Sequence, residues 1–424
     1  MVSAVEFRDV SKRAADGSFA VTEVNLEVKS GETVVVLGPA GSGKSTLLQL
    51  AAGVTAPSAG AVLLDGSPVV DVLPQDRPLA MVSQQQDLYP RLDVGENIAL
   101  PLKLSGLDAE QQEVRVEAMA ERLGLTGLLR LRPRELSAGD LRRVALCRAM
   151  IRRPRLLLLD EPLTGTDAGS LDGLRPVVSE QIRDLGATVI YTAADSGAAP
   201  DAVDRIVILR DGRIRDLGSP RGLWTDPATV FTAAALGDPP MNLVEVSVHV
   251  GLDEFVALGV GAHYLRLPWH DIRSRAIAHY HGERLVLGVR PEAVRPGQGG
   301  NALHGRVLDV EQRAGGTYAR LDIGAGAVDT GPPEADRSAA RRGWFGRLGG
   351  GRGTAAPIAD TVLPPLDRPA RAAVFVVRLP PGSGVVPGRT IPVGFSLSDI
   401  HLFDERGLRI DLGSGSAGSP AGRR

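Results

Sequence analysis

One short segment near the amino terminus constrains the fold of this chain more than any other. It matches the pattern of a phosphate-binding loop and reads Gly38-Pro39-Ala40-Gly41-Ser42-Gly43-Lys44-Ser45. A β-branched apolar run, 33–37, precedes it and a helical stretch, 45–52, follows it, which is the context that such a loop requires. The glycines let backbone N–H groups wrap a phosphate, and the helix start adds positive partial charge.

The types of side chain in this loop predict a bound nucleotide. Lys44 would reach the outer phosphates of ATP, and the Ser45 hydroxyl would bind Mg²⁺. A pattern of this length can arise by chance, but the order of the flanking elements makes chance a poor explanation. The predicted nucleotide contacts of the loop are Gly38, Pro39, Ala40, Gly41, Ser42, Gly43, Lys44, Ser45 and Thr46.

A second segment supplies acidic groups. The apolar run 156–159 ends in Asp160-Glu161, which predicts a buried strand with two carboxylates at its carboxyl end. Ligands of open α/β sheets bind at that end. Asp160 would hold Mg²⁺, and Glu161 would act as general base on the attacking water. Many strands end in acidic turns, so this pattern is informative only because the loop accompanies it.

The rest of the chain predicts two architectures. In the first half, apolar runs alternate with helical stretches such as 109–123 and 141–151, which favours a parallel sheet covered on both faces. After about Gly237, short strands separated by glycine and proline predict a small β-barrel or sandwich. The strands predicted there are 243–250, 262–267, 284–289, 305–310, 318–323 and 373–377.

A segment between the two nucleotide motifs resembles the signature of ABC ATPases. It reads Leu136-Ser137-Ala138-Gly139-Asp140 and precedes a helix. Ser137 and Gly139 keep the positions that, in this family, contact the γ-phosphate of the nucleotide bound by the opposite subunit. An ordinary helix capped by Ser137 is the alternative interpretation.

Further motifs are similar to those of the ATP-binding subunits of bacterial ABC sugar importers. Met81-Val82-Ser83-Gln84 resembles the Q-loop, in which Gln84 would sense Mg²⁺ and the γ-phosphate, and Asp167 fits the D-loop. Segments 287–292 and 400–404 resemble the regulatory β-domain of that family.

The resemblance implies an α/β P-loop NTPase fold, with a RecA-like core and a helical subdomain, followed by an OB-like β-barrel. The expected nucleotide-binding domain is 1–236, with the helical subdomain at about 88–150, and the β-domain is 237–412. We expect a disordered insertion at about 331–358 and a disordered tail at 413–424. Arginines and aromatics at 341–347 could instead contact a membrane surface.

The implied partners are transmembrane permease subunits, a second ABC ATPase subunit in a homo- or heterodimer, and, indirectly, an extracellular substrate-binding protein. We expect a peripheral location on the cytoplasmic face of the membrane. The single cysteine, Cys147, fits a reducing compartment, and no apolar run is long enough to span a bilayer. A net charge of −2 argues against nucleic acid as the main partner.

The sequence departs from the family at the nucleotide site. Ala194 takes the place of the switch histidine, and Asp140 that of the signature glutamine. Ala14 stands where an adenine-stacking aromatic is usual; Phe19 is the nearest substitute, with core packing as the alternative. The segment before Asp167 reads Thr164-Gly165-Thr166, where Ser-Asn-Leu is usual in the family.

These departures predict a chain that binds ATP, hydrolyses it weakly and pairs with a competent second ATPase. A self-sufficient homodimer and a soluble ABC regulator remain as alternatives. His279 and His281, with Glu283, form a pattern that could hold a metal, but an exposed strand end explains it as well.

Overall fold

A computed structural model describes residues 3–84, 88–103, 105–163, 168–251, 255–297, 302–313, 315–328 and 372–412. The chain divides into two compact units, 1–226 and 227–424. The D-loop segment 164–167, the expected insertion at 331–358 and the tail 413–424 lie outside the described residues.

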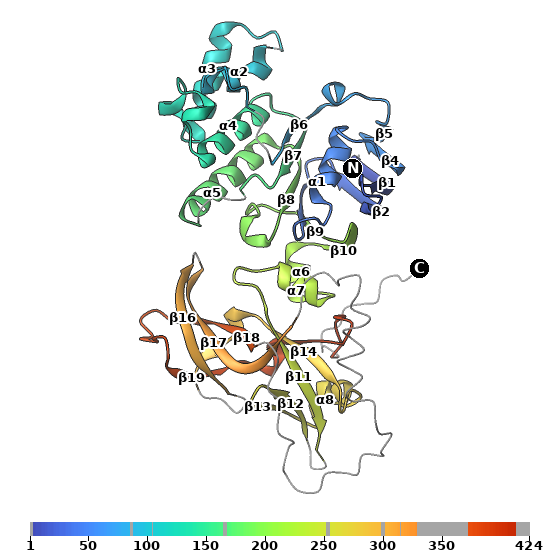
Figure 1. The fold of residues 1–424 in the computed structure, drawn as a ribbon, viewed down its shortest axis with the longest axis vertical. Coiled ribbons are helices and arrows are strands. Elements are labelled where there is room, and N and C mark those ends of the chain that lie inside the picture. The colour runs from blue at the N-terminus through green and yellow to red at the C-terminus, as the bar shows by residue number, and fades with distance from the viewer. Residues whose placement is uncertain are drawn as a thin grey trace. The chain divides into compact units, whose positions relative to one another are not determined.

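A six-stranded sheet organises the first unit (Figure 1). Its neighbouring strands pair in parallel except at one edge, where β10 and β9 are antiparallel. In spatial order the strands are β10 (Arg213–Gly218), β9 (Arg205–Arg210), β3 (Thr33–Leu37), β8 (Thr188–Ala193), β7 (Leu156–Asp160) and β6 (Leu79–Val82). Every residue of β3, β7 and β8 is buried, as expected of parallel strands covered on both faces. The parallel sheet predicted from the sequence is confirmed.

A four-stranded antiparallel sheet, absent from the sequence prediction, packs in the same unit. Its order is β2 (Phe19–Lys29), β1 (Ser3–Arg13), β4 (Ala59–Leu64) and β5 (Ser67–Pro68). Helix α1 (Lys44–Ala52), which follows the phosphate-binding loop, shares one buried core with both sheets. That core includes Phe7 of β1, Leu47 of α1 and Leu158 of β7. The loop is therefore anchored by packing on two sides.

Helices form the remaining part of the first unit. The group between β6 and β7 consists of α2 (Val94–Lys103), α3 (Ala109–Arg122) and α4 (Ala138–Met150), which Figure 1 shows clustered together. Helix α5 (Ala168–Leu185) precedes β8, and α6 (Pro220–Thr225) follows β10. Helix α4 starts three residues before the predicted 141–151, because the Ser137 hydroxyl caps it by accepting the Asp140 N–H at 3.1 Å.

The second unit is a ten-stranded antiparallel sheet that packs around a core rich in valine, leucine and isoleucine. Its longest strands include β11 (Asn242–Val250), β16 (Leu303–Arg313), β17 (Gly316–Ala327) and β18 (Ala372–Leu379). The others are β12 (Phe255–Val260), β13 (His263–Pro268), β14 (Arg284–Val289), β15 (Arg295–Pro296), β19 (Thr390–Gly394) and β20 (Ile400–Phe403). One short helix, α8 (Ile272–Ala278), follows β13.

The division between the units falls before the boundary expected at 236–237. Helix α7 (Val230–Ala235) packs with the β-unit, where Val230 and Ala233 share a small core with Phe403. The Arg290 guanidinium also donates to the Leu236 carbonyl at 2.6 Å. These contacts place the end of the first unit at Asp226.

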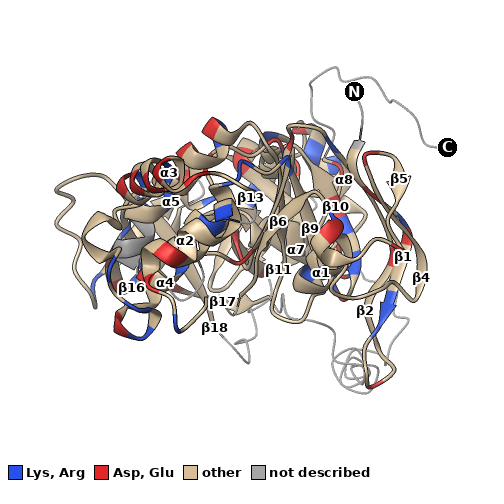
Figure 2. Ribbon diagram, turned by 90° about the horizontal axis from the view of Figure 1, so that it is seen from above, with Lys and Arg blue, Asp and Glu red and all other residues tan. Residues whose placement is uncertain are grey.

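Charge is spread over the described ribbon. Basic and acidic positions are interspersed along both units in Figure 2. Of the helices that the structure describes, none combines the length and the apolar character needed to cross a membrane.

Candidate nucleotide site

Two glycines shape the phosphate-binding loop, which lies between β3 and α1. At Gly43 the backbone has φ 102°, and a Cβ there would lie 2.4 Å from the Ala20 carbonyl oxygen. At Gly38 a Cβ would lie 2.2 Å from the Leu209 carbonyl oxygen. Both positions therefore exclude any side chain, and the loop backbone rests directly on β2 and β9.

Lys44 is buried at the start of α1, with 4% of its side chain exposed. Its ammonium donates to the Gly38 carbonyl at 2.6 Å and to the Pro39 carbonyl at 2.9 Å. It also pairs with Glu161 Oε1 at 3.1 Å. The loop lysine and the expected general base are thus in direct contact.

The two carboxylates at the end of β7 occupy different environments. Asp160 is 3% exposed, and its Oδ1 accepts the Ser45 hydroxyl at 3.0 Å. Glu161 has a left-handed backbone, φ 45°, which is uncommon for a residue with a side chain and costs of order 1–3 kcal/mol. The Gln84 amide donates to Glu161 Oε2 at 3.4 Å. The structure therefore brings Lys44, Ser45, Gln84, Asp160 and Glu161 together.

Thr192 of β8 belongs to this cluster, although sequence reasoning missed it. Its side chain is fully buried, and its hydroxyl donates to Asp160 Oδ1 at 2.8 Å. The Thr192 hydroxyl oxygen also accepts the Glu161 N–H at 2.9 Å. Asp160 and Thr192 are paired across β7 and β8. The available signal was a hydroxyl inside an apolar strand that ends beside the expected switch position.

The residues fit the groups that ATP and Mg²⁺ would present. The buried Ser42 hydroxyl has no hydrogen-bond partner among the described residues and lies in the loop that would wrap a phosphate. Ser45 and Asp160 supply the hydroxyl and carboxylate oxygens that Mg²⁺ prefers. Gln84 adds an amide oxygen from the neighbouring strand end.

Ala194, at the expected switch position, lies directly beside the loop. The Gly38 N–H donates to the carbonyl of the preceding residue, Ala193, at 3.3 Å. Ala194 is exposed and follows the last residue of β8. The next residue, Asp195, turns its carboxylate to the backbone N–H groups of Gly197 and Ala198. The methyl group of Ala194 offers no donor to a phosphate.

Phe19 opens β2 and is 45% exposed, so the core-packing alternative is wrong. The β1–β2 register pairs it with Arg13, whose guanidinium carbon lies 4.5 Å from the ring centroid. Phe19 precedes Ala20, on whose carbonyl the loop rests at Gly43. The ring is therefore an exposed aromatic surface adjacent to the loop, backed by a cation.

The signature segment has its own internal contacts. Ser137 is exposed, and its hydroxyl donates to Asp140 Oδ2 at 2.6 Å. The Arg143 guanidinium donates to Asp140 Oδ1, forming an ion pair one helical turn along α4. The negative charge expected at this helix start is therefore offset by a cation of the same helix.

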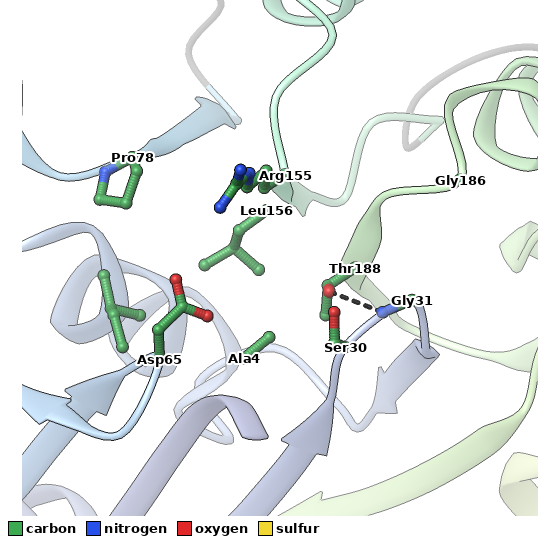
Figure 3. A pocket seen from close by; sticks show the side chains of 10 residues that line it. Ala4, Ser30, Gly31, Asp65, Pro78, Arg155, Leu156, Gly186 and Thr188 are labelled. Carbon is green, nitrogen blue, oxygen red and sulfur yellow. Dashed lines mark hydrogen bonds between the residues drawn. The ribbon is translucent and has the colours of Figure 1, made fainter. Parts of the chain in front are cut away.

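A hollow of about 270 Å³ lies at the amino ends of β7 and β8, away from the nucleotide residues at their carboxyl ends. Figure 3 shows Asp65 and Arg155 reaching into it from different elements. The nucleotide residues lie at the carboxyl ends of these strands. We place the candidate site at the carboxyl ends, because the side chains there have the chemistry to bind a nucleotide. Its lining residues are Ala4, Ser30, Gly31, Leu64, Asp65, Pro78, Arg155, Leu156, Gly186 and Thr188.

In the second unit, the histidines of the weak metal pattern have separate partners. His279 Nδ1 lies 2.9 Å from the Arg275 carbonyl, whereas His281 Nδ1 accepts the Val250 N–H at 3.1 Å. Within the described ranges, no three His, Cys, Asp or Glu side chains gather closely enough to hold a metal ion.

Burial lowers the pKa of Arg290 to about 10.

Comparison with known families matched both units. The family described as "ABC transporter" matches residues 21–164, and that described as "MalK OB fold domain" matches residues 237–294. The β-unit is thus an OB-fold domain that follows a P-loop NTPase domain, as the sequence predicted.

Individual relatives and solved structures cover between about half and three quarters of this chain. A trehalose/maltose import ATP-binding protein of Thermococcus litoralis is 40% identical over 279 residues, 64% of this chain and 74% of that protein. An sn-glycerol-3-phosphate import ATP-binding protein of Paraburkholderia xenovorans is 34% identical, over 76% of this chain and 90% of that protein. A solved dimeric bacterial ABC transporter cassette is 28% identical, with a TM-score of 0.48, over 51% of this chain and 98% of that one.

Proposed function

Because this chain belongs to the ABC transporter family of ATPases, we propose that it is the ATP-binding, energy-coupling subunit of an importer for a sugar or related carbohydrate. The named import functions of its relatives support the substrate class. The single observation that carries the proposal is the cluster of Lys44, Ser45, Asp160 and Glu161 beside the loop.

Each residue of this cluster has a task in the proposed reaction. The loop backbone and Lys44 hold the phosphates, and the exposed ring of Phe19 stacks on the adenine. Ser45, Asp160 and Gln84 hold Mg²⁺, which, when bound, offsets the negative charge of the phosphate oxygens. Glu161 takes a proton from the attacking water once ATP has separated it from Lys44.

We further propose that this site hydrolyses ATP slowly and that a second ATPase subunit completes the active dimer. Ala194 supports this, because no side-chain donor stands at the expected switch position beside Gly38. Ser137 and Gly139 would serve the nucleotide of that second subunit. The partners are membrane permease subunits, with a substrate-binding protein acting through them, and the chain sits on the cytoplasmic face.

Copurification from the host cell tests this assignment. The tagged chain should carry with it integral membrane proteins and a second, different ABC ATPase in equal amounts. Membrane proteins without a second ATPase would contradict the heterodimer. Ribosomal proteins or DNA in place of membrane proteins would contradict the transport role altogether.

A self-sufficient homodimer is the second candidate, and one observation favours it. The ion pair between Asp140 and Arg143 removes much of the repulsion that Asp140 would exert on a phosphate at the start of α4. The signature segment of one copy could then close over the ATP of another copy. Copurification with permeases alone is the result that this candidate expects.

A further inference from the structure

We propose that Thr192 is a positioning residue that orients the metal ligand Asp160 and the general base Glu161, an inference that rests on the proposed ATP site. A single hydroxyl joins the two groups: it donates to Asp160 Oδ1 at 2.8 Å and accepts the Glu161 N–H at 2.9 Å. Thr192 lies two residues before the expected switch position Ala194, and the sequence alone assigned it no role.

The assignment of donor and acceptor follows from the contacts. A threonine hydroxyl has one proton and two lone pairs. The Glu161 N–H can only donate, so it takes a lone pair of Thr192 Oγ1. The proton then goes to the Asp160 carboxylate at 2.8 Å, since the alternative acceptor, the Leu159 carbonyl, is 3.5 Å away. A bond to an ionised carboxylate is the stronger kind.

The position of Thr192 lets it act independently of the loop. Asp160 Oδ1 receives two donors, Ser45 from α1 and Thr192 from β8. Thr192 is fully buried in a strand whose register pairs it directly with Asp160. Ser45 belongs to the loop helix that contacts nucleotide, whereas Thr192 holds the carboxylate from the sheet.

The contact to Glu161 has a second consequence. Glu161 keeps a left-handed backbone, φ 45°, that residues with side chains seldom adopt. Its N–H is held by Thr192, and this bond opposes relaxation to an ordinary backbone conformation. Loss of the hydroxyl would therefore release both the metal ligand and the base.

The simpler interpretation is that Thr192 only satisfies buried polar groups and stabilises the fold. Thr188 supplies a matched control for that interpretation. It lies on the same strand, is 2% exposed, and its hydroxyl accepts the Gly31 N–H at 2.9 Å (Figure 3). It stands at the other end of β8, so Thr188→Val removes one partly buried hydrogen bond of the same strand, away from the nucleotide residues.

The test measures metal dependence of ATP binding in the full chain. ATP affinity is measured by calorimetry in EDTA and across a Mg²⁺ series, and bound Mn²⁺ is followed by electron paramagnetic resonance. Thr192→Val should raise about tenfold the metal concentration at which the gain in ATP affinity is half-maximal. This is the scale of one charge-assisted hydrogen bond. ATP affinity in EDTA should stay unchanged. Thr192→Ser, which keeps the hydroxyl, and Thr188→Val should resemble the parent.

Several outcomes would overturn the proposal. These are a parental metal dependence in Thr192→Val, an equal shift in Thr188→Val, or failure of Thr192→Ser to restore the parental value. Should Thr192→Val not fold, Thr192→Ala carries the same expectation. A parent chain that binds no ATP under either condition contradicts the proposed function instead.

Discussion

At the residue scale, the site owes its order to a few direct contacts between polar side chains. Lys44 is 4% exposed and Glu161 13%, and their ammonium and carboxylate are 3.1 Å apart. Breaking a buried ion pair by removing one partner leaves an uncompensated charge, which typically costs about 3–5 kcal/mol. Incoming phosphate must therefore replace Glu161 as the main counter-charge of Lys44.

Lys44→Ala should weaken ATP binding. It removes a charge-assisted contact to phosphate worth about 1.5–3 kcal/mol, which corresponds to roughly tenfold or more in affinity. Lys12→Ala is the matched control, since Lys12 lies outside the cluster and donates to the Ala56 carbonyl. Calorimetry with Mg²⁺ should show a loss in the first variant alone; equal affinities in Lys44→Ala and the parent would refute the assigned role.

Glu161→Gln should bind ATP at least as tightly as the parent, because Lys44 then gives up no ion pair when phosphate enters. This variant should also lose hydrolysis, since glutamine cannot serve as a base. Titration of a fluorescent ATP analogue measures the affinity. A markedly weaker affinity would show that the Lys44–Glu161 contact does not compete with phosphate.

Phe19→Ala should lower ATP affinity if the exposed ring stacks on adenine. Aromatic stacking contributes about 0.5–1.5 kcal/mol beyond burial, so a loss of up to roughly tenfold is expected. Phe19→Tyr keeps a ring and should bind as the parent does. Comparing ATP with inorganic triphosphate separates the base from the phosphates: only ATP affinity should fall. Unchanged affinity would mean that the base is held otherwise.

At the element scale, the start of α4 combines a helix cap with an ion pair. Ser137 caps the helix, and its hydroxyl proton is directed to Asp140, whose charge Arg143 offsets. A serine engaged in this way must turn from Asp140 before its hydroxyl can donate to a partner's phosphate. The cap stabilises α4 and restrains the signature segment through the same atoms.

Asp140→Gln should therefore favour dimerisation in the presence of ATP. The change removes a carboxylate that would repel a phosphate at the start of α4. It also releases the Ser137 hydroxyl from Asp140. Size-exclusion chromatography with light scattering, using the Glu161→Gln background to retain ATP, should show a larger dimer fraction. Arg143→Gln, which leaves Asp140 unpaired, should shift the equilibrium the opposite way; the same shift in both variants would contradict this account.

At the scale of the whole molecule, the question is whether the chain acts alone. Its OB-fold domain and P-loop domain are both present, while the expected switch position holds Ala194, which has no side-chain donor. Loss of one aligned donor at a reacting centre typically lowers the rate about 10²–10³-fold. A partner with a complete site would compensate for this loss.

The isolated chain should accordingly show little ATPase activity, Ala194→His should recover part of it, and the complex with a second ATPase should be fastest. Steady-state phosphate release compares the three, with Ala193→Ser as a control for substitution at this strand end. Turnover of the isolated parent at the level of the complex would refute the degenerate site and favour the homodimer.

The sequence by itself determined the features that depend on neighbouring residues. The glycine spacing of 38–45, the apolar run before Asp160 and the signature segment predicted the NTPase fold and its main site residues. The antiparallel sheet of β1, β2 and β4 was overlooked, although Val24, Leu26 and Val28 alternate with polar residues there. Arg143 is one helical turn from Asp140 and was also readable.

Only the tertiary structure decided which distant groups meet. Thr192 contacts Asp160, 32 residues away, because β7 and β8 pair in one register; a shift of one residue would turn its hydroxyl to the other face. Phe19 is exposed because β1–β2 pairing places it beside Arg13 at the end of the hairpin. Local patterns determine local structure, whereas strand register is settled by packing of the whole core.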